Sequence, residues 1–287
     1  MHGIALAFIL SFLQPAPAPG RLVDAGGHRL HLNCSGTGSP TVIVEYGLGD
    51  VSTNWLPVQR EVAALTRVCT YDRAGYAWSE PGPMPRTFAQ INFELRTALA
   101  NAGERGPFVL VGHSFGGGVV RQFALDSPGD VAGLVFAEIV SEHQFIRMGT
   151  HAGKIGDGAQ GRTAPAPRAG KGESRGSASA DMEAAEDSQR EWSAEYVARW
   201  VAKPQNGTLG NLPVIVLTRA KGGYGEGLDR PEGELERARL DAQRALALLS
   251  SAGEQRIVDA GHNLHQEAPS AVVSAIRDVV ARARASR

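Results

Sequence analysis

The stretch that decides the fold reads VLVGHSFGGG and occupies residues 109–118. Its residues 112–116 match the pattern G-x-S-x-G. Because glycine and serine are common, the pattern alone is a weak signal, but here it follows a β-rich run and precedes a helical pattern over 119–125. That strand–turn–helix context is the one that the motif requires. We therefore expect a sharp, strained turn that raises the side chain of Ser114 above the edge of a sheet.

Strand-like and helix-like segments alternate outward from this turn. Short apolar runs bounded by Gly and Pro are typical of buried strands, and they occupy residues 30–34, 41–45, 67–71, 108–112, 134–137, 214–217 and 256–258. Helical apolar periodicity occurs over residues 88–99, 235–249 and 269–283. The alternation predicts an α/β fold, with a mostly parallel open sheet and helices on both faces. A barrel is disfavoured, because no helix separates the strands that precede residue 41.

One region interrupts this alternation. Residues 149–180 are rich in Gly, Ala, Ser, Arg and Pro and hold almost no large apolar side chains, so we expect this part to be flexible. The next segment has the pattern of a helix with Trp192, Tyr196 and Trp200 on one face, which either packs on the main domain or faces a substrate. We interpret residues 141–211 as a small cap insertion.

The N-terminus carries an apolar run over 3–13, followed by the small-x-small pattern APA at 16–18. The run is too short to span a bilayer, which takes roughly 20 residues, and it has the length of a signal-peptide core. We expect residues 1–18 to be a signal peptide or N-terminal anchor, the protein to be exported, and no stable membrane span. The main domain then comprises residues 19–140 and 212–287.

Composition narrows the classes of function. Hydrophobic residues make up 43% and charged residues 21% of the 287, as in a soluble globular protein rather than a disordered chain. The 29 Lys and Arg are balanced by 30 Asp and Glu, so the basic excess needed for general nucleic-acid binding is missing. Two cysteines are too few for a disulfide scaffold or a cysteine-rich zinc module. The oligomeric state does not follow from the sequence.

A serine hydroxyl is a poor nucleophile without a base that accepts its proton. We expect His262 to be that base, because it follows the last predicted strand in the sequence DAGH, 259–262. His265 is the competing candidate. His113 stands inside the turn itself, and we expect its side chain to point away from the catalytic face. A metal site is disfavoured, because no third ligand pattern accompanies His262 and His265.

The third member of a catalytic triad is a carboxylate that orients the imidazole. Glu138 follows the predicted strand over 134–137, at the edge where the active sites of open α/β sheets lie. We prefer Glu138 on this ground. The alternatives are Asp229 and Glu226, because they are the first acids after the predicted strand over 214–217.

Two backbone N–H groups are needed to stabilise a developing oxyanion. The N–H of Phe115 lies near the start of a predicted helix, where the helix dipole favours negative charge. We expect the second donor in the loop YGLGD, 46–50, whose glycines allow a close backbone approach. The Leu48 N–H is our candidate.

These motifs together resemble the α/β-hydrolase superfamily, and within it an exported or membrane-proximal bacterial branch with a Val-Cys-x-Tyr-Asp-Arg-Ala-Gly segment, here VCTYDRAG at 68–75. The likeness extends over about 22–140 and 212–283 and leaves out the insertion. It implies an eight-stranded sheet. It also places Cys34 and Cys69 on neighbouring strands, where they can form a disulfide in an oxidising compartment.

The chain departs from the family pattern at two places. Tyr46-Gly47 stands where many members have His-Gly, but the oxyanion hole uses backbone groups and should persist. Many members also carry an acid directly after the penultimate strand, and none is present there in this chain. Some branches use an acid after the sixth strand, which is the position of Glu138.

The resemblance implies acyl transfer to water through an acyl-enzyme, without a cofactor. It favours a serine hydrolase, but the substrate class does not follow from the fold. We expect an ester, or an amide as second choice, of a small and apolar molecule, because of the aromatic residues named next. Trp55, Trp78 and Phe115 are candidate walls of an apolar pocket, and each is equally suited to a place in the core. Two alternatives keep the same fold: a non-hydrolytic acyltransferase or cofactor-free haloperoxidase-like enzyme, and a substrate-binding protein without turnover.

Overall fold

In the computed structural model of this chain, the structure describes residues 19–140, 180–189, 200, 205–222 and 232–286. Several predictions lie outside these residues: the signal peptide over 1–18, nearly all of the flexible segment over 149–180, and the side chains of Trp192, Tyr196, Glu226 and Asp229. Within the described residues, no helix is both long enough and apolar enough to cross a lipid bilayer.

The described strands form one eight-stranded sheet in the order β1-β2-β4-β3-β5-β6-β7-β8. Their bounds are β1 (Arg21–Asp24), β2 (Arg29–Ser35), β3 (Val42–Glu45), β4 (Val68–Tyr71), β5 (Phe108–His113), β6 (Val131–Ala137), β7 (Val214–Arg219) and β8 (Gly253–Val258). β2 is antiparallel to both β1 and β4, and every other pair is parallel. The mostly parallel eight-stranded sheet is therefore confirmed.

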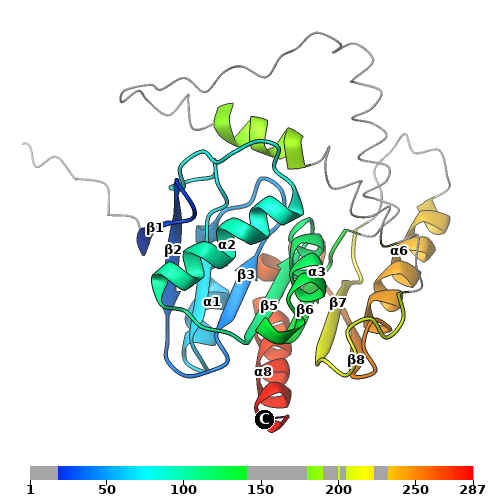
Figure 1. Cartoon of the computed structure of the whole chain (residues 1–287). Coiled ribbons are helices and arrows are strands. Elements are labelled where there is room, and N and C mark those ends of the chain that lie inside the picture. Colours follow the sequence, from blue (N-terminus) through cyan, green and yellow to red (C-terminus); the bar gives the residue numbers. More distant parts are fainter. Residues whose placement is uncertain (1–18, 141–179, 190–199, 201–204, 223–231, 287) are drawn as a thin grey trace, which may run out of the picture.

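Helices cover both faces of this sheet (Figure 1). Because alternate side chains of a strand point to opposite faces, Ile43 of β3 joins one apolar core, and Val42 and Val44 join the other. The first core packs against α2 (Phe88–Ala102), α3 (Gly116–Asp126) and α6 (Glu232–Ala247), and the second against α1 (Leu56–Ala63) and α8 (Pro269–Ala285). The predicted α/β architecture is confirmed on both faces.

Local sequence explains where the long helices begin and end. The Thr87 side chain caps α2 by accepting a hydrogen bond from the Gln90 N–H at 3.0 Å, and Gly103, with φ of 85°, ends the helix in the left-handed region. Pro269 is the first residue of α8, a position that proline favours. Short helical turns complete the fold: η1 (Ser52–Trp55), η2 (Pro128–Asp130) and α7 (Leu264–Glu267).

A disulfide joins β2 to β4 at the antiparallel side of the sheet. Cys34 and Cys69 are directly opposite each other in the strand register, with Cα atoms 4.0 Å apart and their sulfurs bonded. The structure thus contains the disulfide that the family resemblance implies. The outer neighbour of β2 is β1, which we did not predict, because it is four residues long and buries only Val23.

The residues 180–189 form a helix above the carboxyl edge of the sheet (Figure 1). The Ser188 hydroxyl accepts a hydrogen bond from the Arg86 N–H at 2.7 Å, and the Gln189 side chain accepts one from the Tyr76 hydroxyl at 3.3 Å. Both partners lie between β4 and α2. These hydrogen bonds attach residues 180–189 to the segment between β4 and α2.

The contacts of Trp200 distinguish the two alternatives for this aromatic side chain, which were packing on the main domain and facing a substrate. Its ring stacks on Phe88 with 5.9 Å between the centroids, and its indole N–H donates to the Gln122 side chain at 3.1 Å. Only 5% of the residue is exposed. Trp200 therefore packs on the main domain rather than facing a substrate.

Candidate active site

The turn at Ser114 forms where β5 runs directly into α3. Ser114 has a φ of 51°, a left-handed conformation that is uncommon for a residue with a side chain. Two glycines make room for it. A Cβ on Gly116 would lie 2.4 Å from the Glu45 carbonyl oxygen, and one on Gly112 would lie 2.6 Å from a Val120 methyl group. Both positions therefore accept only glycine, and they hold Ser114 in its strained conformation.

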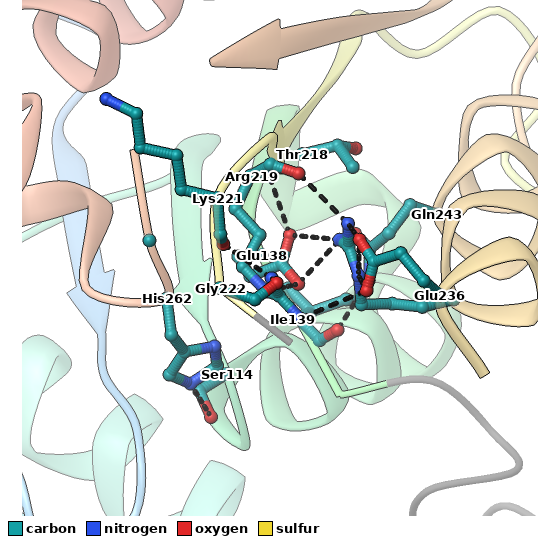
Figure 2. A network of polar contacts seen from close by, with 12 residues as sticks. Ser114, Glu138, Ile139, Thr218, Arg219, Lys221, Gly222, Glu236, Gln243 and His262 are labelled. Atoms are coloured by element: carbon teal, nitrogen blue, oxygen red, sulfur yellow. Dashed lines mark hydrogen bonds and ion pairs between the residues drawn. The ribbon is translucent and has the colours of Figure 1, made fainter. Parts of the chain in front are cut away.

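The side chain of His262 faces the hydroxyl of Ser114. Its Nε2 lies 3.0 Å from the Ser114 Oγ (Figure 2), which is within reach for transfer of the hydroxyl proton. His265, the competing candidate, is buried and stacks on Trp55 with 4.4 Å between the centroids. The His265 Nε2 lies 3.5 Å from the Asp50 carboxylate. The structure thus brings Ser114 to His262 and His265 to Asp50.

Neighbouring side chains hold the loop that carries His262. The His113 Nε2–H donates to the His262 carbonyl oxygen at 3.0 Å, and the Glu267 carboxylate accepts a hydrogen bond from the Gly261 N–H at 2.7 Å. We expected His113 to point away from the catalytic face. Its ring instead lines the cavity beside Ser114 and supports the backbone of the loop that carries His262, because its buried N–H finds an acceptor in the His262 carbonyl.

The environment of His262 keeps its imidazole neutral at pH 7. Burial of the ring lowers the pKa of His262 to about 4, although the residue keeps part of its surface in solvent. The neighbouring His113, Arg219 and Arg239 side chains act in the same direction. A neutral imidazole is the form that can accept a proton from serine.

Glu138 lies at the carboxyl end of β6, with 3% of the residue exposed and φ of 46°. Its carboxylate is bound by Arg219, as Figure 2 shows, and by Arg239. The Arg219 backbone N–H donates at 2.8 Å and its Nε lies at 3.3 Å, while the Arg239 Nη1 lies 2.9 and 3.0 Å from the two oxygens. Burial raises the pKa of Glu138, and the two guanidinium groups oppose that effect.

These contacts determine what Glu138 can do in this arrangement. A carboxylate offers about four acceptor positions, and the arginine contacts fill them. In the part of the chain that the structure describes, the hydrogen bonds of the Glu138 carboxylate go to Arg219 and Arg239 and not to His262. Sequence reasoning missed both arginines, because they lie 81 and 101 residues away along the chain.

The loop after β3 passes close to Ser114. A Cβ on Gly47 would lie only 3.1 Å from the Ser114 Cβ, and both Gly47 and Leu48 line the cavity beside Ser114. The Leu48 N–H donates no hydrogen bond to any residue that the structure describes. Phe115 directly precedes the first residue of α3, so its N–H belongs to the positive end of that helix.

A cavity of about 230 Å³ opens beside Ser114. Its walls are largely polar: Gly47, Leu48, Gly49, Asp50, Asn54, His113, Ser114, His262, Asn263, His265 and Gln266. The predicted apolar walls are elsewhere. Trp55 and Phe115 are fully buried in the apolar cores, and Trp78 packs against His31 at the surface. The described part of the cavity therefore lacks the apolar lining that we expected, because these aromatic side chains pack into cores or against a histidine instead.

Three side chains at this cavity could together bind a cation. Asp50, His113 and His265 each offer a ligand atom within 4.8 Å of the other two. The Asp50 carboxylate already accepts hydrogen bonds from the Asn54 amide at 2.6 Å and the Trp55 indole at 3.0 Å. The 3.5 Å contact between Asp50 and the His265 Nε2 connects the loop after β3 to the segment that follows His262.

Sequence reasoning also missed Arg73. It lies in the VCTYDRAG segment, which marked the family resemblance but received no role of its own. Its side chain is fully buried and reaches the loop after β3. The segment itself was the available signal, because a cation next to a buried strand needs partners.

Comparisons with known proteins place the chain among its relatives. The model of the "Alpha/beta hydrolase family" matches residues 34–275. An "AB hydrolase superfamily protein" of Gibberella zeae is 33% identical over 118 residues, which cover 39% of this chain and 37% of that protein. The protein YqjL of Bacillus subtilis is 26% identical over 85% of both chains. The matches to the first two curated relatives cover less than two fifths of the length of each of those proteins.

The fold also matches solved structures. A thermophilic esterase from Thermogutta terrifontis superposes with a TM-score of 0.63 at 19% sequence identity. The match covers 93% of this chain and 99% of the esterase. At this identity the likeness establishes the fold alone.

Proposed function

The chain belongs to the alpha/beta hydrolase family, and from this premise we propose that it is a serine hydrolase that cleaves a small ester. The observation that carries the proposal is the 3.0 Å distance between the Ser114 Oγ and the His262 Nε2, with Ser114 on a strained turn between a strand and a helix. Strain of this kind is typical of catalytic residues. An amide is the second choice of substrate.

The reaction follows from the roles of these two side chains. The Ser114 Oγ attacks the carbonyl carbon while the neutral His262 accepts the hydroxyl proton. The N–H groups of Leu48 and Phe115 stabilise the oxyanion of the tetrahedral intermediate. When the intermediate collapses, His262 returns the proton to the leaving alcohol, and an acyl-enzyme remains on Ser114. Water then repeats the sequence and releases the acid.

We keep Glu138 as the acid that orients His262 in this proposal. Glu138 shares the left-handed backbone conformation with Ser114, and the Val140 N–H, two residues further on, donates to the Ser114 carbonyl oxygen at 3.1 Å. In the arrangement described, the carboxylate would have to exchange one arginine contact for the His262 Nδ1–H. Asp229 and Glu226 are the competing acids, and they lie outside the described residues.

The described walls of the cavity bear on the substrate. Asn54, Asn263 and Gln266 present amide groups beside Ser114 and His262. We propose a small ester with a polar group on this side, since amides of this kind fix a ligand by hydrogen bonds. No cofactor is required for the reaction as written.

A fluorophosphonate probe tests the nucleophile directly. We expect the probe to label Ser114, as located by peptide mapping, and p-nitrophenyl butyrate to be turned over. Ser114→Ala should abolish labelling and lower kcat by several orders of magnitude. Ser251→Ala, at an exposed serine, is the matched control and should leave both unchanged.

Three outcomes would contradict the proposal in different ways. Turnover that persists in Ser114→Ala removes Ser114 as the nucleophile. A wild-type protein that is neither labelled nor active indicates a binding protein without turnover. Transfer of the acyl group to an added alcohol, or to hydrogen peroxide, in strong preference to water indicates the acyltransferase or haloperoxidase-like alternative.

A further inference from the structure

Arg73 is a buried cation that binds the end of β3 and the loop beside Ser114. Its Nη1 lies 2.5 Å from the Glu45 carboxylate and 2.6 Å from the Tyr46 carbonyl oxygen, and its Nη2 lies 2.5 Å from the Gly47 carbonyl oxygen. The side chains of Arg73 and Glu45 are both fully buried. One guanidinium group thus binds three consecutive residues, from the end of β3 into the oxyanion loop.

The contact at Gly47 fixes the direction of the next N–H group. The Gly47 carbonyl and the Leu48 N–H belong to one peptide unit, which is trans. In a planar trans peptide these two groups point in opposite directions. Because the carbonyl is held toward Arg73, the Leu48 N–H points away from Arg73.

Ser114 lies close to this peptide unit. The Cβ position of Gly47 is 3.1 Å from the Ser114 Cβ, and Leu48 and Ser114 line the same cavity. We propose that Arg73 is a positioning residue of the oxyanion hole, which turns the Leu48 N–H toward the carbonyl that Ser114 attacks. This inference rests on the proposed serine-hydrolase function and goes further by assigning a role to a residue that does not touch the substrate.

Energetics support a positioning role. A buried ion pair stabilises a fold no better than apolar side chains of the same volume, so stability alone does not explain Arg73 and Glu45. A hydrogen bond to a peptide carbonyl polarises the peptide and strengthens its N–H as a donor. The planar fork of arginine can reach two carbonyls at once, whereas the single ammonium of lysine cannot bind them in the same geometry.

Arg73→Lys tests this role, with Arg86→Lys as the matched control. Arg86 is equally buried and pairs with Glu94 at 2.6 Å, but its described hydrogen bonds do not reach the oxyanion loop. We expect Arg73→Lys to lower kcat for p-nitrophenyl butyrate about 10²-fold, the effect of losing one oxyanion donor. KM should stay within about threefold, because the interaction belongs to the transition state. Affinity for an alkylboronic acid should fall in parallel with kcat.

Arg86→Lys should leave kcat within about threefold of the wild-type value, although its thermal stability should fall as much as that of Arg73→Lys. Equal kcat values in the two lysine variants would overturn the inference. The wild-type assay separates the two proposals, because an unlabelled and inactive wild-type protein contradicts the serine-hydrolase function itself.

Amide NMR of the wild-type protein gives a test that does not depend on a folded variant. When an alkylboronic acid forms its tetrahedral adduct on Ser114, the amide protons of Leu48 and Phe115 should both move downfield as they bind the adduct oxygen. A Leu48 signal that does not move would overturn the inference. In Arg73→Lys, the Leu48 shift should shrink while the Phe115 shift persists as the internal control.

Discussion

Two buried carboxylates, Glu45 and Glu138, lie at the carboxyl edge of the sheet, and they differ in what their partners contact. Glu45 is the last residue of β3, Glu138 directly follows β6, and both are paired with arginine. The arginine of Glu45 also binds the carbonyl of Gly47, so that pair supports the loop after β3. Among the described residues, the carboxylate of Glu138 instead accepts its hydrogen bonds from Arg219 and Arg239. A place at the end of a strand therefore does not define a carboxylate's role, whereas its partners do.

The largest expected effect separates the two carboxylates by catalysis. If Glu138 orients His262, Glu138→Gln should lower kcat about 10³- to 10⁴-fold, because the imidazole loses its orienting charge. Glu45→Gln keeps a hydrogen-bond acceptor for Arg73 and should lower kcat far less. Steady-state kinetics of the two variants, with circular dichroism to verify folding, make the comparison.

The competing acid provides the counter-experiment for Glu138. Asp229→Asn and Glu226→Gln should leave kcat near the wild-type value under our proposal. A collapse of kcat in Asp229→Asn alone, with the fold intact, would transfer the role of the acid to Asp229. Glu138 would then be a structural anchor for Arg219 and Arg239.

The second prediction concerns stability. Among the described residues Glu45 has one guanidinium partner, whereas Glu138 has two. Arg73→Met should therefore lower the free energy of unfolding by about 3–5 kcal/mol, the cost of leaving a buried charge unpaired. Arg239→Met should cost less, because Arg219 still binds Glu138. Urea unfolding at pH 7 measures both.

A double variant shows whether the loss of stability in Arg73→Met comes from the unpaired charge of Glu45 or from lost packing. In Glu45→Leu/Arg73→Met the charge and its partner are removed together, so most of the lost stability should return. A double variant as unstable as Arg73→Met would mean that packing, rather than the unpaired carboxylate, is responsible. Activity should stay low in the double variant, since the Gly47 carbonyl has still lost its donor.

The pH dependence of kcat/KM should distinguish the surroundings of the two carboxylates. Catalysis requires neutral His262, whose pKa is lowered to about 4, so kcat/KM should hold from pH 7 down to about pH 5 and fall near pH 4. Arg239 contributes to this lowering. Arg239→Met should therefore move the acid limb to higher pH, whereas Arg73→Met should not move it. This limb belongs to the arrangement described, in which Glu138 binds its arginines; a wild-type limb near pH 6.5 would mean that in the free enzyme a carboxylate, as proposed for Glu138, has already exchanged to the imidazole.

The sequence predicted those parts of the molecule that depend on local pattern. The parallel strands and the turn at Ser114 follow from apolar runs and from glycines at fixed spacing, which act over a few residues. β1 and α1 were missed, because the first buries a single side chain and the second is a short helix opened by Leu56 and Pro57. Neither has a pattern long enough to predict it.

The candidate site was predictable to the same extent. Ser114 and His262 each follow a strand, and their side chains lie 3.0 Å apart in the structure. The partners of Glu138 and the contacts of Arg73 were not predictable, because they depend on tertiary packing and on the direction of one peptide plane. Trp55 suited a pocket wall and a core equally, because of its size and apolar surface, and the structure places it fully buried in the core.

The smallest expected effect on stability concerns a third carboxylate, Glu254, which is also paired with arginine but is exposed to solvent. Glu254 on β8 pairs with Arg256 at 2.7 Å and with Arg282, but its side chain is 38% exposed. The side-chain hydrogen bonds to these arginines lower the pKa of Glu254 to about 2, so its stabilising effect is present above its usual pKa and is lost as the pH falls through about 2. Screening by water should limit the effect of Glu254→Gln at pH 7 to less than about 1 kcal/mol. Urea unfolding of Glu254→Gln in low and high salt measures this effect, with the exposed Glu61→Gln as control. The loss of unfolding free energy should disappear in high salt. A loss as large as that of Arg73→Met would mean that exposure does not separate these carboxylates.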